Sequence, residues 1–351
     1  MIDTLDTPCV LIDLDIVERN IARAQRQFDA LGIGFRPHIK THKIPLLAQM
    51  QLQAGAIGIA VQKVSEAEVF AKAGCTDIIL CFNLLSAAKI TRARALRTLC
   101  HLTVVADNPA VVAALSAGMA GAKDPLDVLV ECDTGMGRCG VQSPEAARDL
   151  AVLIEATPNL RFAGLMTYPP NHATLQVEAF LSKARALCLI SPGHCRVISG
   201  GGTPGLTDAA LAPTVTEYRA GTYIYNDRSL IALGTCTADD CALTVLATVV
   251  SRPTPNRAII DAGSKALTSD LLGLKGYGLI PAYANAAIHG LSEEHGHIDL
   301  TACQTKPEIG DKLRIIPNHA CPVSNLFDHV TLHRSSQILR EQQVSARGCV
   351  T

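Results

Sequence analysis

Eight short apolar runs rich in β-branched residues recur along the first two thirds of this 351-residue chain. They occupy residues 33–38, 57–61, 77–81, 102–106, 127–132, 162–167, 195–199 and 214–219. Stretches with helical signals separate most of them, and the stretch at 143–155 opens with Ser143 as an N-cap followed by Pro144. Strands that alternate with helices predict parallel pairing through helical crossovers. Eight such units predict a (β/α)8 barrel, whose chemistry lies at the carboxyl ends of the strands.

A doubly wound open sheet is the alternative architecture, but no GxGxxG motif follows the first run. The pattern changes near residue 240, where runs 241–250, 257–261, 312–316 and 329–332 indicate strands joined by turn-rich connections. We therefore predict two domains. A barrel spans residues 1–240, with first residues that could pair with the second domain, and a mainly β domain spans residues 241–351.

Composition excludes several classes of function. Lys and Arg number 31 against 32 Asp and Glu, and the chain has no Trp, which argues against a nucleic acid partner. No apolar run approaches the ~20 residues of a membrane span, and the acidic N-terminus does not resemble a signal peptide. The thirteen cysteines form no CxxC pair, so we expect most to be small buried hydrophobes in a reducing cytoplasm.

The first run ends in a basic segment, RPHIKTHK at 36–43. This is where a barrel presents catalytic residues. If the segment is extended, His38 and Lys40 share a face. A desolvated lysine at the barrel mouth can act as an amine nucleophile and form a Schiff base. The alternative is a solvated basic loop.

Three further strand ends carry candidate anion-binding residues. The seventh run is followed by the glycines of SGGGTP at 199–204, whose backbone N–H groups can bind a phosphate unless the segment is a plain turn. Gly, Thr and Tyr of the next segment, EYRAGTYIYND at 217–227, could complete this phosphate cup. After the fifth run, Arg138 could pair with an oxyanion or with a local carboxylate.

The β domain contains His319-x-Cys321. In an extended segment both side chains project from one face, and imidazole with thiolate suits Zn²⁺. A rival metal cluster is EEHGH at 293–297, which a polar surface loop would equally explain.

Together these segments resemble the D-threonine aldolase and D-serine dehydratase family, which are pyridoxal-phosphate enzymes with the alanine-racemase type of fold (fold type III). The resemblance runs from residue 7 to about 330 and is most specific at 36–43 and 317–322. It implies a barrel followed by a β domain, with Lys40 as the cofactor lysine and His38 beside it. The residues implied to hold the cofactor phosphate are Gly201, Gly202, Gly221, Thr222 and Tyr223.

The resemblance also implies that Arg138 lies beside the cofactor ring and that Tyr168 approaches the ring nitrogen or edge. His319 and Cys321 would bind a divalent metal, zinc or manganese, near the β-hydroxyl of a β-hydroxy-D-amino acid. A homodimer in which both domains contribute to each active site is implied as well. The loop TYPPNH at 167–172 departs from the usual sequence of this loop in the family. The role of Tyr168 and the substrate preference can therefore differ from those that the resemblance implies.

Two reactions follow from this set of residues. In the leading one, His42 or His172 takes the β-hydroxyl proton and the Cα–Cβ bond breaks, giving glycine and an aldehyde. In the alternative, Lys40 takes the Cα proton and the hydroxyl leaves, giving a keto acid and ammonia. The Cys at the second ligand position is typical of the dehydratases. A racemase, a non-catalytic cofactor-handling protein and a metal-dependent hydrolase are weaker alternatives, because none explains both Lys40 and the metal pair.

Overall fold

The computed structural model describes residues 2–351 and divides into two compact units. The barrel unit comprises residues 24–40, 45–221 and 349–351, and the β unit comprises residues 2–23, 41–44 and 222–348. The chain changes unit five times, at 23/24, 40/41, 44/45, 221/222 and 348/349. Each unit is described by itself.

The barrel unit contains a parallel eight-stranded sheet in the order β2-β9-β8-β7-β6-β5-β4-β3. Its strands are β2 (Gly34–Phe35), β3 (Ile59–Val61), β4 (Asp77–Leu80), β5 (His101–Ala106), β6 (Leu126–Cys132), β7 (Leu160–Thr167), β8 (Val197–Gly200) and β9 (Glu217–Tyr218). The two ends of the sheet meet, because His38 pairs with Ala60 and the Ala60 N–H donates to the Pro37 carbonyl at 2.8 Å. Each predicted strand is found, and the predicted barrel is confirmed.

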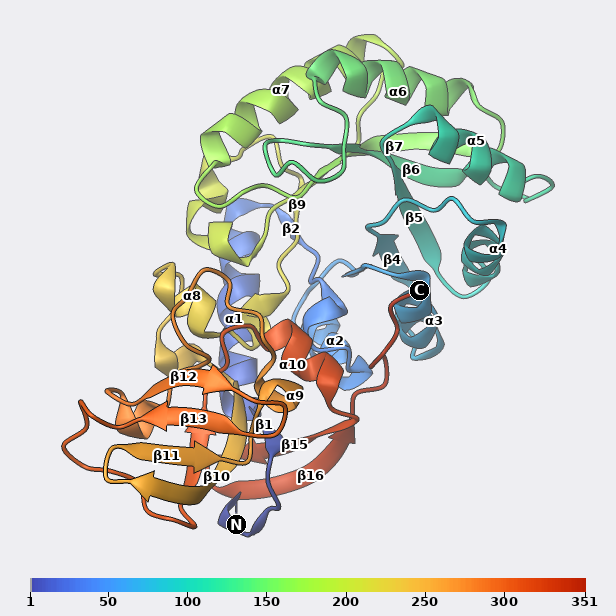
Figure 1. Ribbon diagram of the computed structural model, residues 1–351. Coiled ribbons are helices and arrows are strands. Elements are labelled where there is room, and N and C mark those ends of the chain that lie inside the picture. Colours follow the sequence, from blue (N-terminus) through green and yellow to red (C-terminus); the bar gives the residue numbers. More distant parts are fainter. Residues whose placement is uncertain (1) are drawn as a thin grey trace. The chain divides into compact units, whose positions relative to one another are not determined.

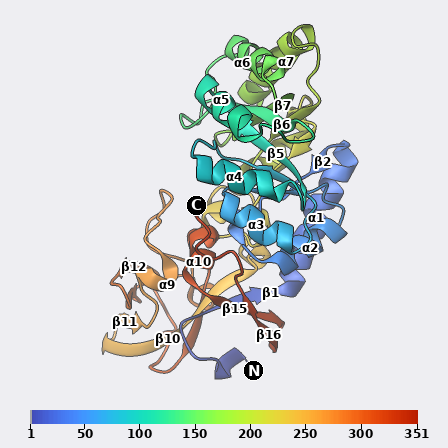
Figure 2. The same ribbon diagram turned by 90° about the vertical axis from the view of Figure 1, so that its right-hand side faces the viewer.

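Helices cover the outside of this sheet (Figure 1). They are α2 (Pro45–Gln53), α3 (Val64–Lys72), α4 (Ala87–Leu96), α5 (Pro109–Gly118), α6 (Pro144–Ala156) and α7 (Thr174–Ile190), with the 3-10 helices η2 (Ile39–Thr41) and η3 (Thr203–Leu211). In the turned view of Figure 2, α5, α4, α3 and α2 follow one another along the outside. Side-chain caps set the starts of α4 and α6, where Ser86 and Ser143 accept backbone N–H groups and Pro144 occupies the first turn of α6.

Side chains alternate between the inside and the outside of the barrel, as the two-residue period of a strand requires. An apolar layer fills the inside, made by Ala60, Ile79, Cys81, Val105, Leu129, Ala163 and Met166. On the outside, Phe28 of α1 (Leu14–Leu31) stacks between two rings, Phe35 of β2 and Tyr218 of β9, with centroids 4.8 and 4.7 Å away. The two shortest strands are therefore held by aromatic packing as well as by hydrogen bonds.

The β unit is built on a second eight-stranded sheet, ordered β12-β13-β11-β10-β1-β15-β16 with β14 paired to β10. Its strands are β1 (Cys9–Asp13), β10 (Leu243–Thr254), β11 (Arg257–Ile260), β12 (Ala287–Leu291), β13 (Gly296–Asp299), β14 (Lys312–Ile315), β15 (His329–Arg334) and β16 (Gln337–Gln343). Its short helices are η1 (Ile2–Thr4), η4 (Thr222–Ile224), α8 (Arg228–Ala232), η5 (Ala238–Asp240), α9 (Ser264–Leu267), η6 (Pro281–Tyr283) and α10 (Ala320–Leu326).

The division between the units differs from the one expected at residues 240 and 241. The chain leaves the barrel unit directly after its last strand, at Gly221, so residues 222–240 belong to the β unit. At the other end of the chain, β1 pairs antiparallel with β10 and parallel with β15. Strands β12, β13 and β16 were not predicted, because glycines and charged residues interrupt their apolar pattern.

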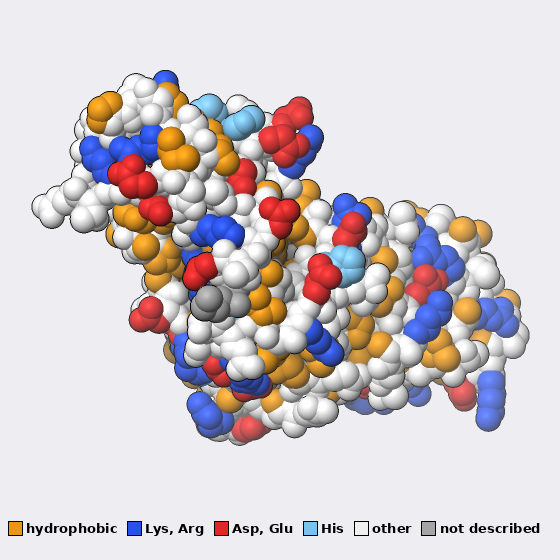
Figure 3. Space-filling view, turned by 90° about the horizontal axis from the view of Figure 1, so that it is seen from below, with side chains coloured by type: hydrophobic (Ala, Val, Ile, Leu, Met, Phe, Trp, Pro, Cys, Tyr) orange, Lys and Arg blue, Asp and Glu red, His pale blue; other side chains and the backbone are white. Residues whose placement is uncertain are grey.

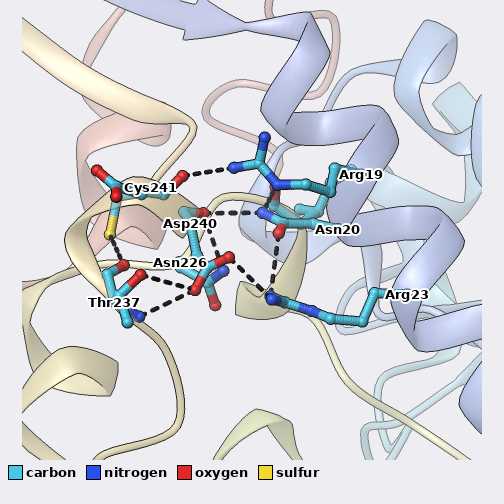
Figure 4. A network of polar contacts seen from close by, with 9 residues as sticks. Arg19, Asn20, Arg23, Asn226, Thr237, Asp240 and Cys241 are labelled. Atoms are coloured by element: carbon cyan, nitrogen blue, oxygen red, sulfur yellow. Dashed lines mark hydrogen bonds and ion pairs between the residues drawn. The ribbon is translucent and has the colours of Figure 1, made fainter.

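A polar network fixes residues 222–240 within the β unit (Figure 4). The Asn20 side chain on α1 donates to the carbonyls of Asp240 at 2.8 Å and Ile224 at 3.3 Å. Arg23 donates to the Asp240 carboxylate at 2.8 Å, and Asn226 donates to the Asp240 carbonyl at 3.0 Å. The segment that follows Thr222 is thus held to α1 at several points.

The surface carries both signs of charge. On the face shown in Figure 3, Lys and Arg side chains are intermingled with Asp and Glu rather than gathered into one basic patch. Within residues 2–351, no helix has the length and apolar character needed to cross a membrane. All thirteen cysteines are free thiols.

The aromatic stack gives a test of how the short strands are held. Phe28 is fully buried, so we expect Phe28→Ala to lower the free energy of unfolding by about 3–5 kcal/mol through lost burial and a new cavity. Phe28→Leu refills most of that volume and should cost clearly less. Denaturant unfolding of the two variants measures the difference. Equal losses would show that the stack does not support β2 and β9.

Candidate active site

Lys40 lies in the 3-10 turn η2 rather than in an extended strand, which corrects the expectation that His38 and Lys40 share a strand face. Strand β2 ends at Phe35, and the Lys40 N–H then donates to Nδ1 of His38 at 3.4 Å. This local contact bends the chain at the end of the strand. His38 and Lys40 remain neighbours, at the carboxyl end of β2 where a barrel places its chemistry.

Tyr168, directly after β7, brings two cations together. The Lys40 Nζ atom lies 5.9 Å from the centroid of its ring, and the Arg138 Cζ atom lies 4.9 Å from it. Both distances are within the range of cation–π attraction. The structure therefore places three predicted site residues, Lys40, Arg138 and Tyr168, at one end of the barrel.

The loop that carries Arg138 is pinned at its base. Backbone hydrogen bonds join Asp133 to Val141 at 3.1 Å and Val141 to Glu131 at 2.9 Å. The Asp133 carboxylate accepts the N–H groups of Gly135 and Gly137 at 3.0 and 3.1 Å. Arg138 thus projects from a short loop with a fixed conformation.

The glycine loop after β8 packs against two tyrosines. Gly201 has a φ of +97°, and an added Cβ atom would lie only 2.4–2.5 Å from three ring carbons of Tyr218. The Tyr218 hydroxyl donates to the Gly202 carbonyl at 3.0 Å, and Tyr168, His172, Gly201 and Gly202 line one cavity. Glycines at these positions allow a phosphate to approach the backbone N–H groups closely. These residues fit the phosphate and ring of the implied cofactor, with Lys40 as its amine.

A layer of charged side chains lies inside the barrel. Arg36 donates to Glu217 at 3.0 Å and to Asp77 at 2.6 Å, and Ser199 donates to Glu217. Burial alone would lower the pKa of Arg36, but the charges of Glu217 and Asp77 raise it by more than burial lowers it. The net shift of the pKa is upward, so the guanidinium stays charged. Arg219 continues the layer by donating to Ser199 and, at 2.6 Å, to the carbonyl of Thr167.

The β unit holds the predicted metal pair at the start of α10. His319 is the N-cap residue of this helix with an extended backbone, and Cys321 lies in its first turn. This corrects the expectation of one extended segment. The Ala320 N–H between them donates to the buried carboxylate of Asp227 at 3.0 Å, which fixes the helix start.

Both side chains of the predicted metal pair have polar partners. The His319 Nδ1 atom lies 2.6 Å from Oδ2 of Asp270. The Cys321 sulfur lies 3.2 Å from the hydroxyl of Thr41 and 3.6 Å from that of Thr222. Burial lowers the pKa of His319, but the thiolate charge of Cys321 and the Asp270 carboxylate raise it to about 9. Imidazole and thiolate held in this way suit a borderline-soft divalent metal such as Zn²⁺.

A buried hydroxyl lies near this pair. Tyr225 is fully buried, and its oxygen has no hydrogen-bond partner among residues 2–351. Burial raises the pKa of this phenol, and the charge of Cys321 raises it further. An orphaned donor near Cys321 fits a site that takes up a further group.

The rival cluster at 293–297 does not form a metal site. Lys265 pairs with Glu293 at 3.2 Å and with Glu294 at 2.8 Å, and Ser292 bonds to His297 at 3.1 Å. No group of three or more His, Cys, Asp and Glu side chains in residues 2–351 is arranged to hold a metal.

The remaining predicted residues are divided between the units. His42 belongs to the β unit and is fully buried, and its Nδ1 atom accepts the Ile44 N–H at 3.1 Å. His172 belongs to the barrel unit and is exposed, with a φ of +58°. Gly221 belongs to the barrel unit, whereas Thr222 and the buried Tyr223 belong to the β unit. The Thr222 hydroxyl lies 3.6 Å from the Cys321 sulfur.

Sequence reasoning missed Asp270, Thr41 and Glu131. Asp270 lies 49 residues before His319 in the chain, so no local pattern links them. Thr41 was visible in the basic segment, directly after Lys40. Glu131 lies two residues after the inward-facing Leu129, and that alternation could have indicated a carboxyl group inside the barrel. Burial raises the pKa of Glu131, and the charge of Arg138 opposes this rise.

Family models match both parts of the chain: "Alanine racemase, N-terminal domain" over residues 12–229 and "Putative serine dehydratase domain" over residues 242–333. D-threonine aldolase of Arthrobacter sp. is 33% identical over 98% of this chain and 93% of its own length. D-threo-3-hydroxyaspartate dehydratase of Delftia sp. (strain HT23) is 34% identical over 92% of this chain and 93% of its own length.

Solved structures agree with these relatives. The crystal structure of D-threonine aldolase from Filomicrobium marinum has a TM-score of 0.89 at 29% identity and covers 99% of this chain and 98% of its own. A cysteine-to-alanine variant of D-threo-3-hydroxyaspartate dehydratase in the metal-free form has a TM-score of 0.86 at 31% identity, covering 97% and 98%. The chain belongs to the family that joins an alanine racemase N-terminal domain to a serine dehydratase domain.

The contact between Gly201 and Tyr218 can be tested by adding one methyl group. We expect Gly201→Ala to lower the free energy of unfolding by about 1–3 kcal/mol, because the new Cβ overlaps the Tyr218 ring at a positive φ. Gly202→Ala is the matched control, because its Cβ would lie 3.4 Å from Tyr168, an ordinary contact. Thermal unfolding measures both variants. If they behave alike, the packing of Gly201 on Tyr218 does not constrain the loop.

Proposed function

We propose that this chain is a lyase of β-hydroxy-D-amino acids that uses pyridoxal 5'-phosphate at Lys40 and a divalent metal at His319 and Cys321. Retro-aldol cleavage to glycine and an aldehyde is the leading reaction. The observation that carries the proposal is the grouping of Lys40, Arg138 and Tyr168 at one end of the barrel. The relatedness to a D-threonine aldolase over 98% of the chain supports it.

The barrel unit would hold the cofactor with its own residues. The Lys40 amine attaches it, the N–H groups near Gly201 and Gly202 bind its phosphate, and Arg138 and Tyr168 orient its ring. When bound, pyridoxal phosphate withdraws electrons from the substrate Cα atom. The ion pair between Arg36 and Glu217 holds the start of the segment that leads to Lys40.

In the β unit, His319 and Cys321 would supply two protein ligands to zinc or manganese. A bound divalent metal contributes Lewis acidity toward a hydroxyl group. The metal-free form of a related dehydratase supports the metal. Of the two candidate bases for the β-hydroxyl proton, His172 is favoured, because it is exposed whereas His42 is buried with Nδ1 engaged by Ile44.

β-Elimination is the second candidate reaction. Here Lys40 takes the Cα proton and the β-hydroxyl leaves, which yields a 2-keto acid and ammonia. The Cys at position 321 favours this reading, as does the 34% identity to a hydroxyaspartate dehydratase. A racemase is less favoured, because the solved alanine racemase of Clostridium difficile shares only the fold, at 12% identity.

We also propose a cytoplasmic homodimer. Thirteen free thiols suit a reducing compartment, and the family resemblance supports the dimer. Size-exclusion chromatography with light scattering measures the oligomeric state, and a monomer at micromolar concentration would contradict the dimer.

The assignment of Lys40 as the cofactor lysine is tested by the absorption spectrum of the protein. We expect the protein incubated with pyridoxal phosphate to show a visible absorption band that borohydride removes, and Lys40→Ala to lose both this band and turnover. Lys63→Ala is the matched control, because Lys63 also follows a barrel strand but lies 3.7 Å from the ring of Phe82. A Lys40→Ala protein that still shows, after dialysis, a visible band that borohydride removes would disprove the assignment.

The reaction is tested by its products. With Mn²⁺ or Zn²⁺ present, D-threonine should give glycine and acetaldehyde in equal amounts, and L-threonine should react poorly. Accumulation of 2-oxobutanoate and ammonia instead would establish the elimination. Chelator should abolish either reaction, and added metal should restore it. Equal turnover of D- and L-threonine, or activity that survives complete metal removal, would favour the racemase.

A further inference from the structure

The carboxylate of Asp270 is placed to control which nitrogen of His319 faces a metal. Its Oδ2 atom lies 2.6 Å from Nδ1 of His319, within the range of a charge-assisted hydrogen bond. A carboxylate accepts and does not donate, so the shared proton belongs to Nδ1. The proton on Nε2 is then the one that a metal displaces, and this leaves the Nε2 lone pair for the metal.

The loop that carries Asp270 is anchored on both sides of this contact. The Asp270 N–H donates to the Thr268 hydroxyl at 3.1 Å, and the Thr268 N–H donates to the Ser264 carbonyl at 3.0 Å at the end of α9. On the other side, the Asn318 side chain donates to the Gly276 carbonyl at 2.8 Å. The residue before His319 and the loop after Asp270 are thus bonded to each other, so the pair does not depend on one flexible contact.

Asp270 and Cys321 have different partners. The Asp270 carboxylate bonds to the His319 imidazole, whereas the Cys321 sulfur is contacted by the hydroxyls of Thr41 and Thr222 and also interacts with His319. Residues 2–351 contain no third carboxylate, thiol or imidazole arranged with His319 and Cys321 as a metal cluster. A carboxylate behind a ligand histidine fixes the ring and strengthens it as a donor.

We infer that Asp270 is the positioning residue of His319, which holds the proton on Nδ1 and presents Nε2 as the metal-binding nitrogen. This inference rests on the proposed function, because it assigns a role toward the metal of that site. It predicts that metal affinity, and not attachment of the cofactor at Lys40, depends on Asp270.

The test uses Co²⁺ as the probe metal on the full chain loaded with pyridoxal phosphate. The thiolate of Cys321 should give a charge-transfer band on Co²⁺ binding, and its titration reports affinity without any assay of activity. We expect Asp270→Asn to weaken Co²⁺ binding about 10–100-fold, with the visible cofactor band unchanged. Asp270→Glu keeps the carboxylate and should recover part of the affinity.

Two controls make the result specific. Glu293→Gln removes a carboxylate of the same unit that pairs with Lys265 on the surface, and it should bind Co²⁺ as the unmodified protein does. In a His319→Ala background, Asp270→Asn should have no further effect, because Asp270 acts through His319. An additive loss in the double variant would make Asp270 a direct ligand and overturn the positioning role.

Unchanged affinity in Asp270→Asn, with normal binding in the unmodified protein, would overturn the inference and leave the proposed function standing. A protein that gains the cofactor band but binds no Co²⁺ would overturn the inference together with the metal part of the proposed function. Circular dichroism of each variant confirms that the compared chains are folded.

Discussion

A buried ion pair between Arg36 and Glu217 ties the first strand of the barrel to the last. Strands β2 and β9 contribute only two residues each to the sheet, so backbone pairing alone gives them little support. Asp77 adds a second carboxylate from β4, which extends the tie across the closing edge. Loss of either partner of a buried pair leaves an uncompensated charge, at a cost of about 3–5 kcal/mol. Because Arg36 precedes Lys40 by four residues, the same pair fixes the start of the segment that carries the lysine.

Local patterns made the barrel strands predictable, and the contacts that complete the site were not local. Apolar runs with β-branched residues located all eight strands, because a parallel strand is buried on both faces. The sequence Ser143-Pro144 predicted the start of α6, because serine is a common N-cap residue and proline is common in the first turn of a helix. By contrast, β1 joins the β unit by pairing with strands more than 200 residues away, which no sequence window can contain.

The candidate site shows the same limit at the level of single residues. The sequence indicated a lysine at a strand end and a histidine near a cysteine as candidate site residues. These types could be predicted because few residue types can form a Schiff base or bind a metal. Their conformations could not be predicted from the sequence. Lys40 lies in a turn whose backbone donates a hydrogen bond to His38, and Cys321 lies in a helix whose first N–H group is bonded to Asp227. Asp270 is set by tertiary structure alone. The candidate residues found from sequence are therefore those whose type the proposed chemistry restricts, whereas the residues that hold them in place required the structure.

The packing of Gly201 on Tyr218 also has a consequence for how such a chain can diverge. The ring fills the space that a side chain at position 201 would need, while its hydroxyl holds the carbonyl of the next residue. A larger residue at 201 requires a smaller one at 218, and that change would also remove a ring from the stack on Phe28. Positions 201, 218 and 28, which lie on three different elements, are therefore expected to covary in evolution. A substitution in the glycine loop should be accompanied by a compensating substitution in helix α1.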